Sequence, residues 1–375
     1  MTMRCEDTRQ FGVYSTLRSD ILGGRYASVR FPSERSLAMR FKVSRATIAR
    51  CLADLDREGL IRRSQGRGTF ITRQGLSRKI GLVLPGIVPY SEYFQPIVSE
   101  LMRIAQAESF ELRLGSISSR DIKSRTHEVR ELAAEFIKNK VAGIIYQPLE
   151  YVDDANEANA RILAVFKKVG IPVVLLDSDI LLPPSRSSYD CVTIDNVDAG
   201  ERVANHLFER GAKNVRFFML PGMLSTVAKR IRGVICSAVL HGHRWTRENV
   251  VVAQPDDRKA VRRLMRGNHR PDAIICENDM VADVLLTTLA GLNVKVPDDV
   301  MLAGFDDMQR ARLATPTLTS IHQPYAEIAK SAFCRLVSRI SRPDLPTISI
   351  SLPAPLVIRD STKRKTPTGT SRGMR

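Results

Sequence analysis

The sequence predicts a small helical module that ends in a β-hairpin, followed by two α/β domains that each carry a parallel sheet. Within residues 1–71, three segments with helical periodicity precede two short strand segments around a glycine-bearing turn. From residue 80 onward, short apolar runs alternate with amphipathic segments of helix length, which is typical of parallel sheets covered on both faces. Roughly 280 residues of this alternation fit two sheet domains better than one.

The composition indicates a globular protein. The chain has 375 residues, of which 43% are hydrophobic. No segment approaches the roughly 18 uninterrupted apolar residues of a membrane span, and the polar N-terminus lacks the apolar core of a signal peptide, so we expect a cytoplasmic, nucleoid-associated protein. The 6 cysteines form no C-x-x-C pair and no cluster with histidines, so we expect reduced thiols, no metal site and no cofactor.

The positive charge is concentrated at the N-terminus. The formal net charge is +17, and residues 1–79 hold 17 lysines and arginines against 7 acidic residues. Residues 80–358 are close to neutral, with 34 basic and 32 acidic side chains, whereas residues 359–375 hold 6 against 1. A neutral body with a basic head is expected when one domain binds a phosphate backbone. The alternative is a generally basic, solvated surface. Charge alone does not distinguish the two, and sequence motifs are needed.

The N-terminal module is predicted to contain three helices and a hairpin. The first helix is expected over residues 10–22, before two glycines, and Ser33 and Ser44 are placed to cap the second and third helices. In the third helix, apolar residues recur at i, i+3, i+4 and i+7, which predicts one buried stripe with polar residues facing outward at the helix start. The stripe consists of Ile48, Cys51, Leu52 and Leu55, and the outward residues are Arg45, Thr47, Ala49 and Arg50.

Short polar and arginine side chains at a helix start are what helix-turn-helix domains use to reach base edges in the major groove. Arginine can form two parallel hydrogen bonds to guanine, and threonine can contact a thymine methyl group. Strands at 60–63 and 69–72 are expected to form a wing, in which Arg62, Arg63 and Arg67 bind phosphates rather than bases. A solvated surface position is the alternative for Arg45 and Arg50.

The segment from Leu17 to Ile71 resembles the DNA-binding domain of the GntR family over its whole length. The resemblance rests on PSERSLA (residues 32–38), VSRATI (43–48) and REGLIRRSQGRGTF (57–70), which are specific in combination. Many family members carry arginine where this chain has Ala49, so one base contact is expected to be missing. The resemblance implies a winged helix-turn-helix, mainly α with a β wing, that binds palindromic operators as a homodimer. It implies DNA contacts by Arg35, Ser44, Arg45, Thr47 and Gly66.

After residue 80, polar residues follow several of the predicted strands. Strands are expected at 80–84, 112–114, 142–146, 173–176, 191–194, 214–220, 273–276, 301–305 and 319–322. Helices are expected at 94–107, 127–139, 199–210, 229–240, 280–290 and 325–341. Because ligands of open α/β sheets bind at the carboxyl ends of strands, Asn278 and Asp306 are candidate site residues. Arg230 adds a charged donor at a helix start, and this combination suits sugar hydroxyl groups.

Residues 80–356 resemble the effector domain of LacI/GalR regulators. The most specific segments are PDAIICENDMVA (271–282) and VPDDVMLAGFDDMQRARLATPTLTSIHQP (296–324); KIGLVLPG (79–86), VTIDNVDAGERVANHLFERGAKNVRFF (192–218) and AKRIRGV (228–234) support them. With a GntR-type head, this is similar to transcriptional regulators of the arabinose-repressor type. The resemblance implies a two-lobed α/β, periplasmic-binding-protein-like (type I) domain with three crossovers and an effector cleft. It implies effector contacts by Arg230, Asn278 and Asp306, and more weakly by Asp198.

Each candidate has a structural alternative. Asp306 can simply pair with Arg230, and Lys229 can assist Arg230 or face solvent. The aromatic residues Tyr90, Tyr93 and Phe94 follow the first strand, where such folds stack sugar rings; Phe94 is our candidate, with ordinary packing as the alternative. Asp279 and Asp307 are expected to cap helices rather than touch a ligand.

The sequence therefore divides into a DNA-binding domain (1–71), a linker (72–79), an effector-binding and dimerisation domain (80–358) and a basic disordered tail (359–375). We expect a sequence-specific transcriptional repressor whose binding to double-stranded operator DNA is controlled by a small effector, a mono- or disaccharide. An enzyme is not expected, because the motifs G-x-S-x-G, Walker loop and H-E-x-x-H are absent. An effector-independent DNA-binding protein and a sugar-binding protein of another class are the alternatives.

Overall fold

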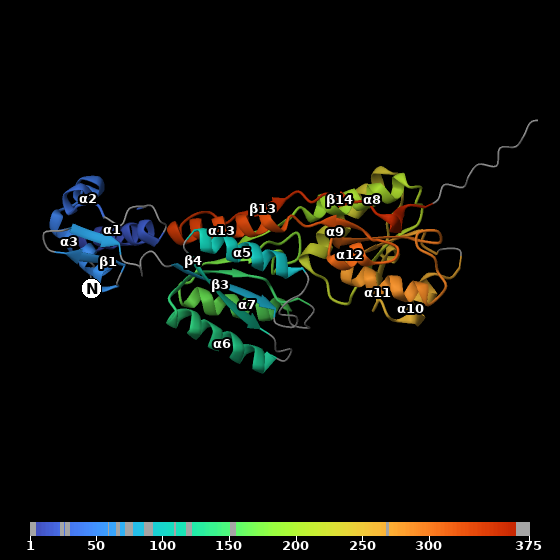
Figure 1. Ribbon diagram of the computed structural model, residues 1–375, viewed down its shortest axis with the longest axis horizontal. Helices are drawn as coiled ribbons and strands as arrows, with labels where there is room; N and C mark the ends of the chain where they lie inside the picture. Colours follow the sequence, from blue (N-terminus) through green and yellow to red (C-terminus); the bar gives the residue numbers. More distant parts are fainter. Residues whose placement is uncertain are drawn as a thin grey trace, which may run out of the picture.

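The computed structural model describes residues 5–22, 26, 31–58, 60–64, 68–71, 78–85, 93–108, 110–117, 122–150, 155–267 and 270–364 (Figure 1). Gly66, Arg67 and Tyr90, which the sequence proposed as contacts, lie outside these residues. Figure 1 shows an N-terminal head, a first lobe beside it and a second lobe at the far end. Among the helices described, none combines the length and the apolar character that crossing a membrane requires.

The head contains three helices and a hairpin, as predicted. These are α1 (Cys5–Leu22), α2 (Glu34–Phe41), α3 (Arg45–Arg57), and the antiparallel strands β1 (Ile61–Ser64) and β2 (Gly68–Ile71). The predicted stripe of α3 is fully buried and packs with Leu17, Ile21 and Leu37 in one core. Lys42 ends α2 in the left-handed conformation (φ 52°), and its N–H donates to the carbonyl oxygen of Ala38. The chain can therefore turn sharply into α3.

The first lobe is built on a parallel six-stranded sheet in the order β13-β7-β6-β5-β3-β4. Leu82 faces the core that contains α5 and α13, whereas its neighbour Val83 faces the core that contains α6 and α7. Both faces are thus covered, as Figure 1 shows. The strands are β3 (Arg78–Pro85), β4 (Phe110–Ile117), β5 (Val141–Tyr146), β6 (Val173–Leu176), β7 (Asp190–Ile194) and β13 (Ser349–Leu352), and the helices are α5 (Phe94–Ala107), α6 (Ile122–Lys138), α7 (Ala155–Lys168) and α13 (Tyr325–Ser341).

The second lobe carries a six-stranded sheet in the order β14-β12-β11-β10-β8-β9, in which only β14 runs antiparallel to its neighbour. Its strands are β8 (Val215–Met219), β9 (Val250–Val252), β10 (Ala273–Cys276), β11 (Met301–Asp306), β12 (Thr319–His322) and β14 (Leu356–Val357). Its helices are α8 (Asn196–Glu209), α9 (Ser225–Leu240), α10 (Arg258–Leu264), α11 (Asp279–Ala290) and α12 (Gln309–Leu313), with short 3₁₀ turns at Arg247–Asn249 and Asp360–Thr362.

The chain crosses between the lobes three times, as predicted. The crossings run from β7 into α8, from β12 into α13, and from β13 into β14. Each crossing follows a strand, so the carboxyl ends of strands from both sheets approach one another at the junction. This junction is therefore where the sequence analysis expects a ligand.

The sequence missed several elements on the sheet edges. Strands β9, β13 and β14 were not predicted, and helices α7, α10 and α12 were not among the helices given by range. β13 is half exposed, with alternating serine and aliphatic residues, so it lacks the continuous apolar run that marked the central strands. β3 also begins at Arg78, inside the predicted linker, whereas residues 72–77 lie outside the described chain.

The predicted disordered tail is wrong for its first part, residues 359–364. Ser361 and Thr362 are fully buried. The Ser361 hydroxyl donates to the carbonyl oxygen of Leu302 (2.6 Å), and Thr362 Oγ1 lies 2.8 Å from His206 Nε2. Polar side chains can pack here because groups of β11 and α8 satisfy their hydrogen bonds, which composition alone does not reveal. Residues 365–375 lie outside the described chain.

Candidate functional sites

The N-terminus of α3 is fixed by two of the predicted DNA contacts. Ser44 Oγ accepts a hydrogen bond from the Thr47 N–H (3.1 Å) and shares another with Thr47 Oγ1 (2.8 Å). Ser44 is thus the N-cap of α3, as predicted. The cap leaves Arg45 exposed in the first helical turn.

The head presents exposed arginines around this helix start. Arg35, Arg45 and Arg50 are exposed, and none forms an ion pair with a residue that the structure describes. Arg63 in β1 instead pairs with Glu34 Oε1 at 2.5 Å, so part of its charge is already balanced. Ala49 is only partly exposed. The predicted readers on α2 and α3 are therefore free to meet an external anion.

Two side chains of α1 donate hydrogen bonds to Glu58, the residue that follows α3. Arg18 Nε donates to Glu58 Oε2 (3.0 Å), and the Tyr14 hydroxyl donates to Glu58 Oε1. Burial, together with the hydrogen bond to Glu58, raises the pKa of Tyr14 to about 12. Tyr14 therefore remains a donor to Glu58 at neutral pH and well above it.

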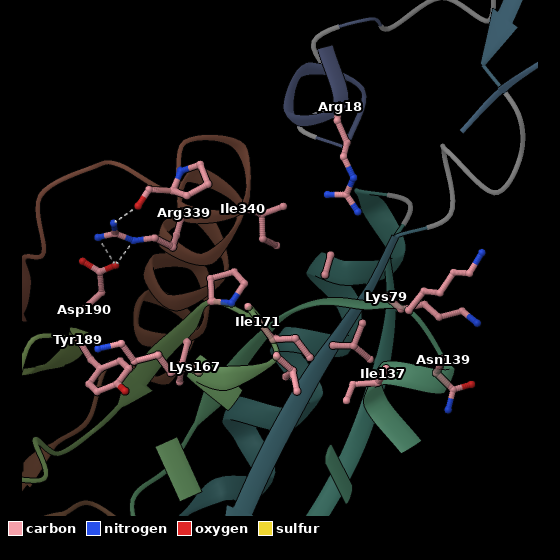
Figure 2. Close-up of a pocket in the computed structure, with 18 of the residues that line it drawn as sticks. Arg18, Lys79, Ile137, Asn139, Lys167, Ile171, Tyr189, Asp190, Arg339 and Ile340 are labelled. Atoms are coloured by element: carbon pink, nitrogen blue, oxygen red, sulfur yellow. Dashed lines mark hydrogen bonds and ion pairs between the residues drawn. The ribbon is translucent and has the colours of Figure 1, made fainter. Parts of the chain in front are cut away.

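A crevice of about 1260 Å³ separates this head from the first lobe (Figure 2). Arg18 reaches into it from the head, opposite Lys79, Lys167 and the C-terminal end of α13. Asp190, buried in its wall, pairs with Arg335 (2.8 Å) and with Arg339 (2.8 Å). The head therefore lies against the end of α13, a helix that enters the first lobe from the second.

At the junction of the lobes, two glycines place Arg230. A side chain at Gly200 in α8 would meet the Arg230 carbonyl oxygen at 2.1 Å, and one at Gly233 in α9 would meet the Val197 carbonyl oxygen at 2.0 Å. The backbones of α8 and α9 thus touch directly. This close packing directs Arg230, in the second turn of α9, into the protein, where it is 5% exposed.

The guanidinium of Arg230 is held by groups from three segments. Its Nε donates to Asn196 Oδ1 (2.9 Å), its Nη1 donates to the carbonyl oxygen of Glu277, and its Nη2 lies 3.5 Å from Asp306 Oδ1. The group also lies over the ring of Phe305, 4.4 Å from the ring centre. A buried arginine is tolerated here because at least three of its five N–H groups have acceptors in the protein.

Asp306 occupies a strained position at the end of β11. Its φ of 102° and the φ of 50° at Asp307 are unfavourable for residues with a side chain. Gln323 Nε2 donates to Asp306 Oδ1 (3.0 Å), and the Tyr325 hydroxyl donates to the Asp306 carbonyl oxygen (2.5 Å). Burial raises the pKa of Asp306, and Arg230 and Gln323 partly offset this rise. Such strain at a strand end is typical of ligand sites.

The first lobe supplies a facing wall, of which the sequence named Tyr93 as a candidate but not Asp177. Asp177 follows β6 with φ 69° and accepts a hydrogen bond from the Tyr93 hydroxyl (2.8 Å). Burial raises the pKa of Asp177, and Arg230 in the other lobe opposes this rise. Burial and the charge of Asp177 raise the pKa of Glu150 to about 8. The rings of Tyr93 and Tyr325, one from each side of the junction, lie 5.8 Å apart.

These residues form what we call the inter-lobe cluster: Tyr93, Glu150, Asp177, Arg230, Asp306, Gln323 and Tyr325. Asp177 and Gln323 each follow a strand, so the strand-end rule that selected Asp306 would also have selected them. Glu150 lies four residues beyond β5 and carried no such signal. Within the described residues, no group of acidic, histidine or cysteine side chains is arranged to hold a metal ion.

The other predicted effector residues have different surroundings. Asn278 is the N-cap of α11, and its Oδ1 accepts from the Val281 N–H at 2.9 Å. Asp198 pairs with Arg202 at 2.5 Å on the surface of α8. Phe94 is half-buried and packs edge-on against Tyr93, with ring centres 4.8 Å apart. For these three, effector contact stays a prediction.

The two aspartates that we expected to cap helices do not. Asp279 is buried, accepts from Ser320 Oγ (2.7 Å) and from the Met308 N–H (2.9 Å), and leaves the cap of α11 to Asn278. Asp307 pairs with Arg312 (3.0 Å) and with Arg359 (2.5 Å). Although burial acts to raise it, hydrogen bonds from these arginines lower the pKa of Asp307. Both carboxylates therefore brace the loop around Asp306.

Two family models match the chain. Bacterial regulatory proteins of the gntR family match residues 10–71, and a periplasmic binding protein-like domain matches residues 204–362. An arabinose metabolism transcriptional repressor of Geobacillus stearothermophilus is 27% identical over 366 residues, covering 93% of this chain and 97% of the relative. The HTH-type transcriptional repressor PurR of Mannheimia succiniciproducens is 26% identical over 293 residues, covering 77% and 82%. These relatives are transcriptional repressors rather than enzymes.

Among solved structures, the complex of the transcriptional regulator CelR with cellobiose superposes with a TM-score of 0.64 at 20% sequence identity. The match covers 88% of this chain and 100% of that chain. At this identity the likeness concerns the fold, and it agrees with the two-lobed architecture described above.

Replacing Glu150 with glutamine tests the electrostatics of the cluster. Folded, Glu150 keeps its proton up to about pH 8, whereas its ordinary pKa is 4.5. The folded state therefore binds more protons between these values, and stability falls as the pH rises through this window. Glu150→Gln cannot ionise at this position, so it should not lose this stability. The melting temperature of the variant minus that of the wild type should therefore be larger at pH 8 than at pH 5. An equal difference at both pH values, or one matched by Glu157→Gln on the exposed side of α7, would contradict this assignment.

Proposed function

We propose that this chain is a transcriptional repressor of the LacI type with a GntR-family head, and that a sugar-like effector held between its lobes controls how the head binds operator DNA. The observation that carries the proposal is the buried Arg230, which Asp306 and Asn196 hold at the lobe junction. A buried guanidinium group, with several N–H donors in one plane, and a carboxylate acceptor beside it suit neighbouring hydroxyl groups of a sugar. An effector-independent DNA-binding protein would not need such a cluster.

The head is the proposed reader of DNA. Arg45 in the first turn of α3 meets base edges in the major groove, with Ser44 and Thr47 fixing the helix start beside it. Arg35 and Arg50, both exposed, add contacts from α2 and α3. Gly66 and Arg67 of the wing are proposed to approach the backbone. Two heads of a homodimer would bind the halves of a palindromic operator.

Helix α13 is the proposed connection between effector and DNA. Its first residue, Tyr325, donates to the Asp306 carbonyl oxygen, and Arg339 near its end lines the crevice next to the head. Its 17 residues span about 25 Å. Effector binding changes how the two lobe walls meet, α13 shifts with them, and the placement of the head changes. The effector acts only through its different affinities for the two arrangements.

Replacing Arg45 with alanine tests the reader. The variant should lose about 1–3 kcal/mol of binding free energy for operator DNA and relax the preference at one base pair. The measurement is fluorescence anisotropy on fragments from the promoter region at fixed salt. Arg57→Ala, at the other end of the same helix, is the control and should retain both affinity and preference. Equal losses in the two variants would show that charge alone, and not base reading, underlies binding.

Replacing Arg230 with alanine tests the sensor. The variant should bind the same DNA with unchanged affinity but no longer respond to any sugar that changes wild-type binding. Because removal of a buried charge can destabilise the protein, Arg230→Lys is measured alongside, with circular dichroism to establish folding. Lysine keeps the charge but not the planar fork, so its response should also weaken. Arg232→Ala, exposed on α9, is the control. A normal sugar response in folded Arg230→Ala would refute the assignment.

A further inference from the structure

We infer that the effector of this chain is a hydroxylated molecule that carries a protonated amine, such as an amino sugar. The inference rests on the proposed function and narrows the chemistry of its ligand. It depends on two independent features of the inter-lobe cluster: its balance of charge, and the kind of buried atom that lacks a partner.

Carboxyl groups outnumber cations in this part of the described junction. Three carboxyl groups, of Glu150, Asp177 and Asp306, act on one another there, against the two cations Arg230 and Lys229. Arg230 is already committed to Asn196, the Glu277 carbonyl oxygen and Asp306. Lys229, partly exposed on α9, is the other cation that acts on Asp177 among the described residues named here. Buried carboxylates in excess of their cations are costly, so a ligand that brings positive charge is favoured and an anionic one is disfavoured.

The buried atoms without partners at the junction are acceptors. Gln323 is fully buried, and because its Nε2 donates to Asp306, its Oε1 is turned away and receives no hydrogen bond from the described residues. Glu150 Oε1 is also buried without a described partner. Gln147, 1% exposed, follows β5 at the same sheet edge, and its Oε1 likewise receives none. A ligand that satisfies these atoms must donate, and an ammonium group only donates.

The protonation of the carboxyl groups agrees with this assignment. The pKa values of Glu150, Asp177 and Asp306 are all raised, mainly by burial, so protons partly replace the missing positive charge. An ammonium group beside Glu150 and Asp177 would favour their charged forms and displace protons. Binding of an amine should therefore release protons to the buffer, whereas a neutral sugar has no such effect on these groups.

The test compares matched sugars that differ at one substituent. Glucosamine, galactosamine and mannosamine are titrated into the full chain by calorimetry at pH 7, beside their parent hexoses, their N-acetyl forms and the corresponding uronates. At least one amine should bind about tenfold or more tightly than its parent and its N-acetyl form. Its heat should differ between two non-amine buffers of unlike ionisation enthalpy by the amount that proton release predicts.

Glu150→Gln distinguishes charge recognition from general packing. This variant should lose most of the preference for the amine over its parent hexose and most of the proton release. Glu157→Gln should behave as the wild type. If Glu150→Gln weakened the affinity for the amine and for the parent hexose by the same factor, the inference would be wrong.

Three other results overturn the inference: a neutral or acidic sugar that binds as tightly as its amine, no binding by any amine, or binding of an amine without proton release. The proposed function fails separately. If neutral sugars bind and Arg230→Ala abolishes that binding, the proposed sensor function is supported and only the inferred preference for an amine is wrong. If an amine binds Arg230→Ala undiminished, the site lies elsewhere and both proposals fail.

Discussion

The structure depends on the need to satisfy one buried guanidinium. Arg230 reaches the lobe junction because α8 and α9 touch backbone to backbone at Gly200 and Gly233, where no side chain would fit. Once there, its donors require Asn196, the Glu277 carbonyl oxygen and Asp306, and so draw together the start of α8 and the ends of β10 and β11. The strained backbone at Asp306 is maintained by this demand, with Gln323 and Tyr325 on its other side.

The same cluster is connected mechanically to the head. Tyr325 belongs both to the cluster and to the first turn of α13, and the far end of that helix carries Arg339, which pairs with Asp190 beside the head crevice (Figure 2). A helix transmits displacement along its axis with little bending, so the proposed function requires that a change at Asp306 moves the end of α13 near Arg18. The head has one core of its own around the α3 stripe. In the proposed function, DNA binding is therefore controlled by where the head is held rather than by how it folds.

The sequence revealed what is local and periodic, and missed what depends on distant partners. The α3 stripe and the cap at Ser44 follow from spacing within a few residues, and the central strands from their apolar runs. That Arg230 and Asp306 lie together could be expected because residues that follow neighbouring strands meet at one edge of the sheet. The expectation that Asp279 caps α11 was wrong because distant partners, Ser320 and the Met308 N–H, take its carboxylate. The burial of Ser361 needs a partner 59 residues away, at Leu302, and composition carries no trace of it.

The most direct test of the account is the reciprocity of its two sites. The affinity for operator DNA is measured with and without a saturating ligand that requires Arg230, and the affinity for that ligand is measured with and without saturating DNA. Coupling through the cluster and α13 predicts that both affinities change by one common factor, of about 5-fold to 150-fold. A ligand that needs Arg230 for binding yet leaves the affinity for DNA unchanged would contradict it.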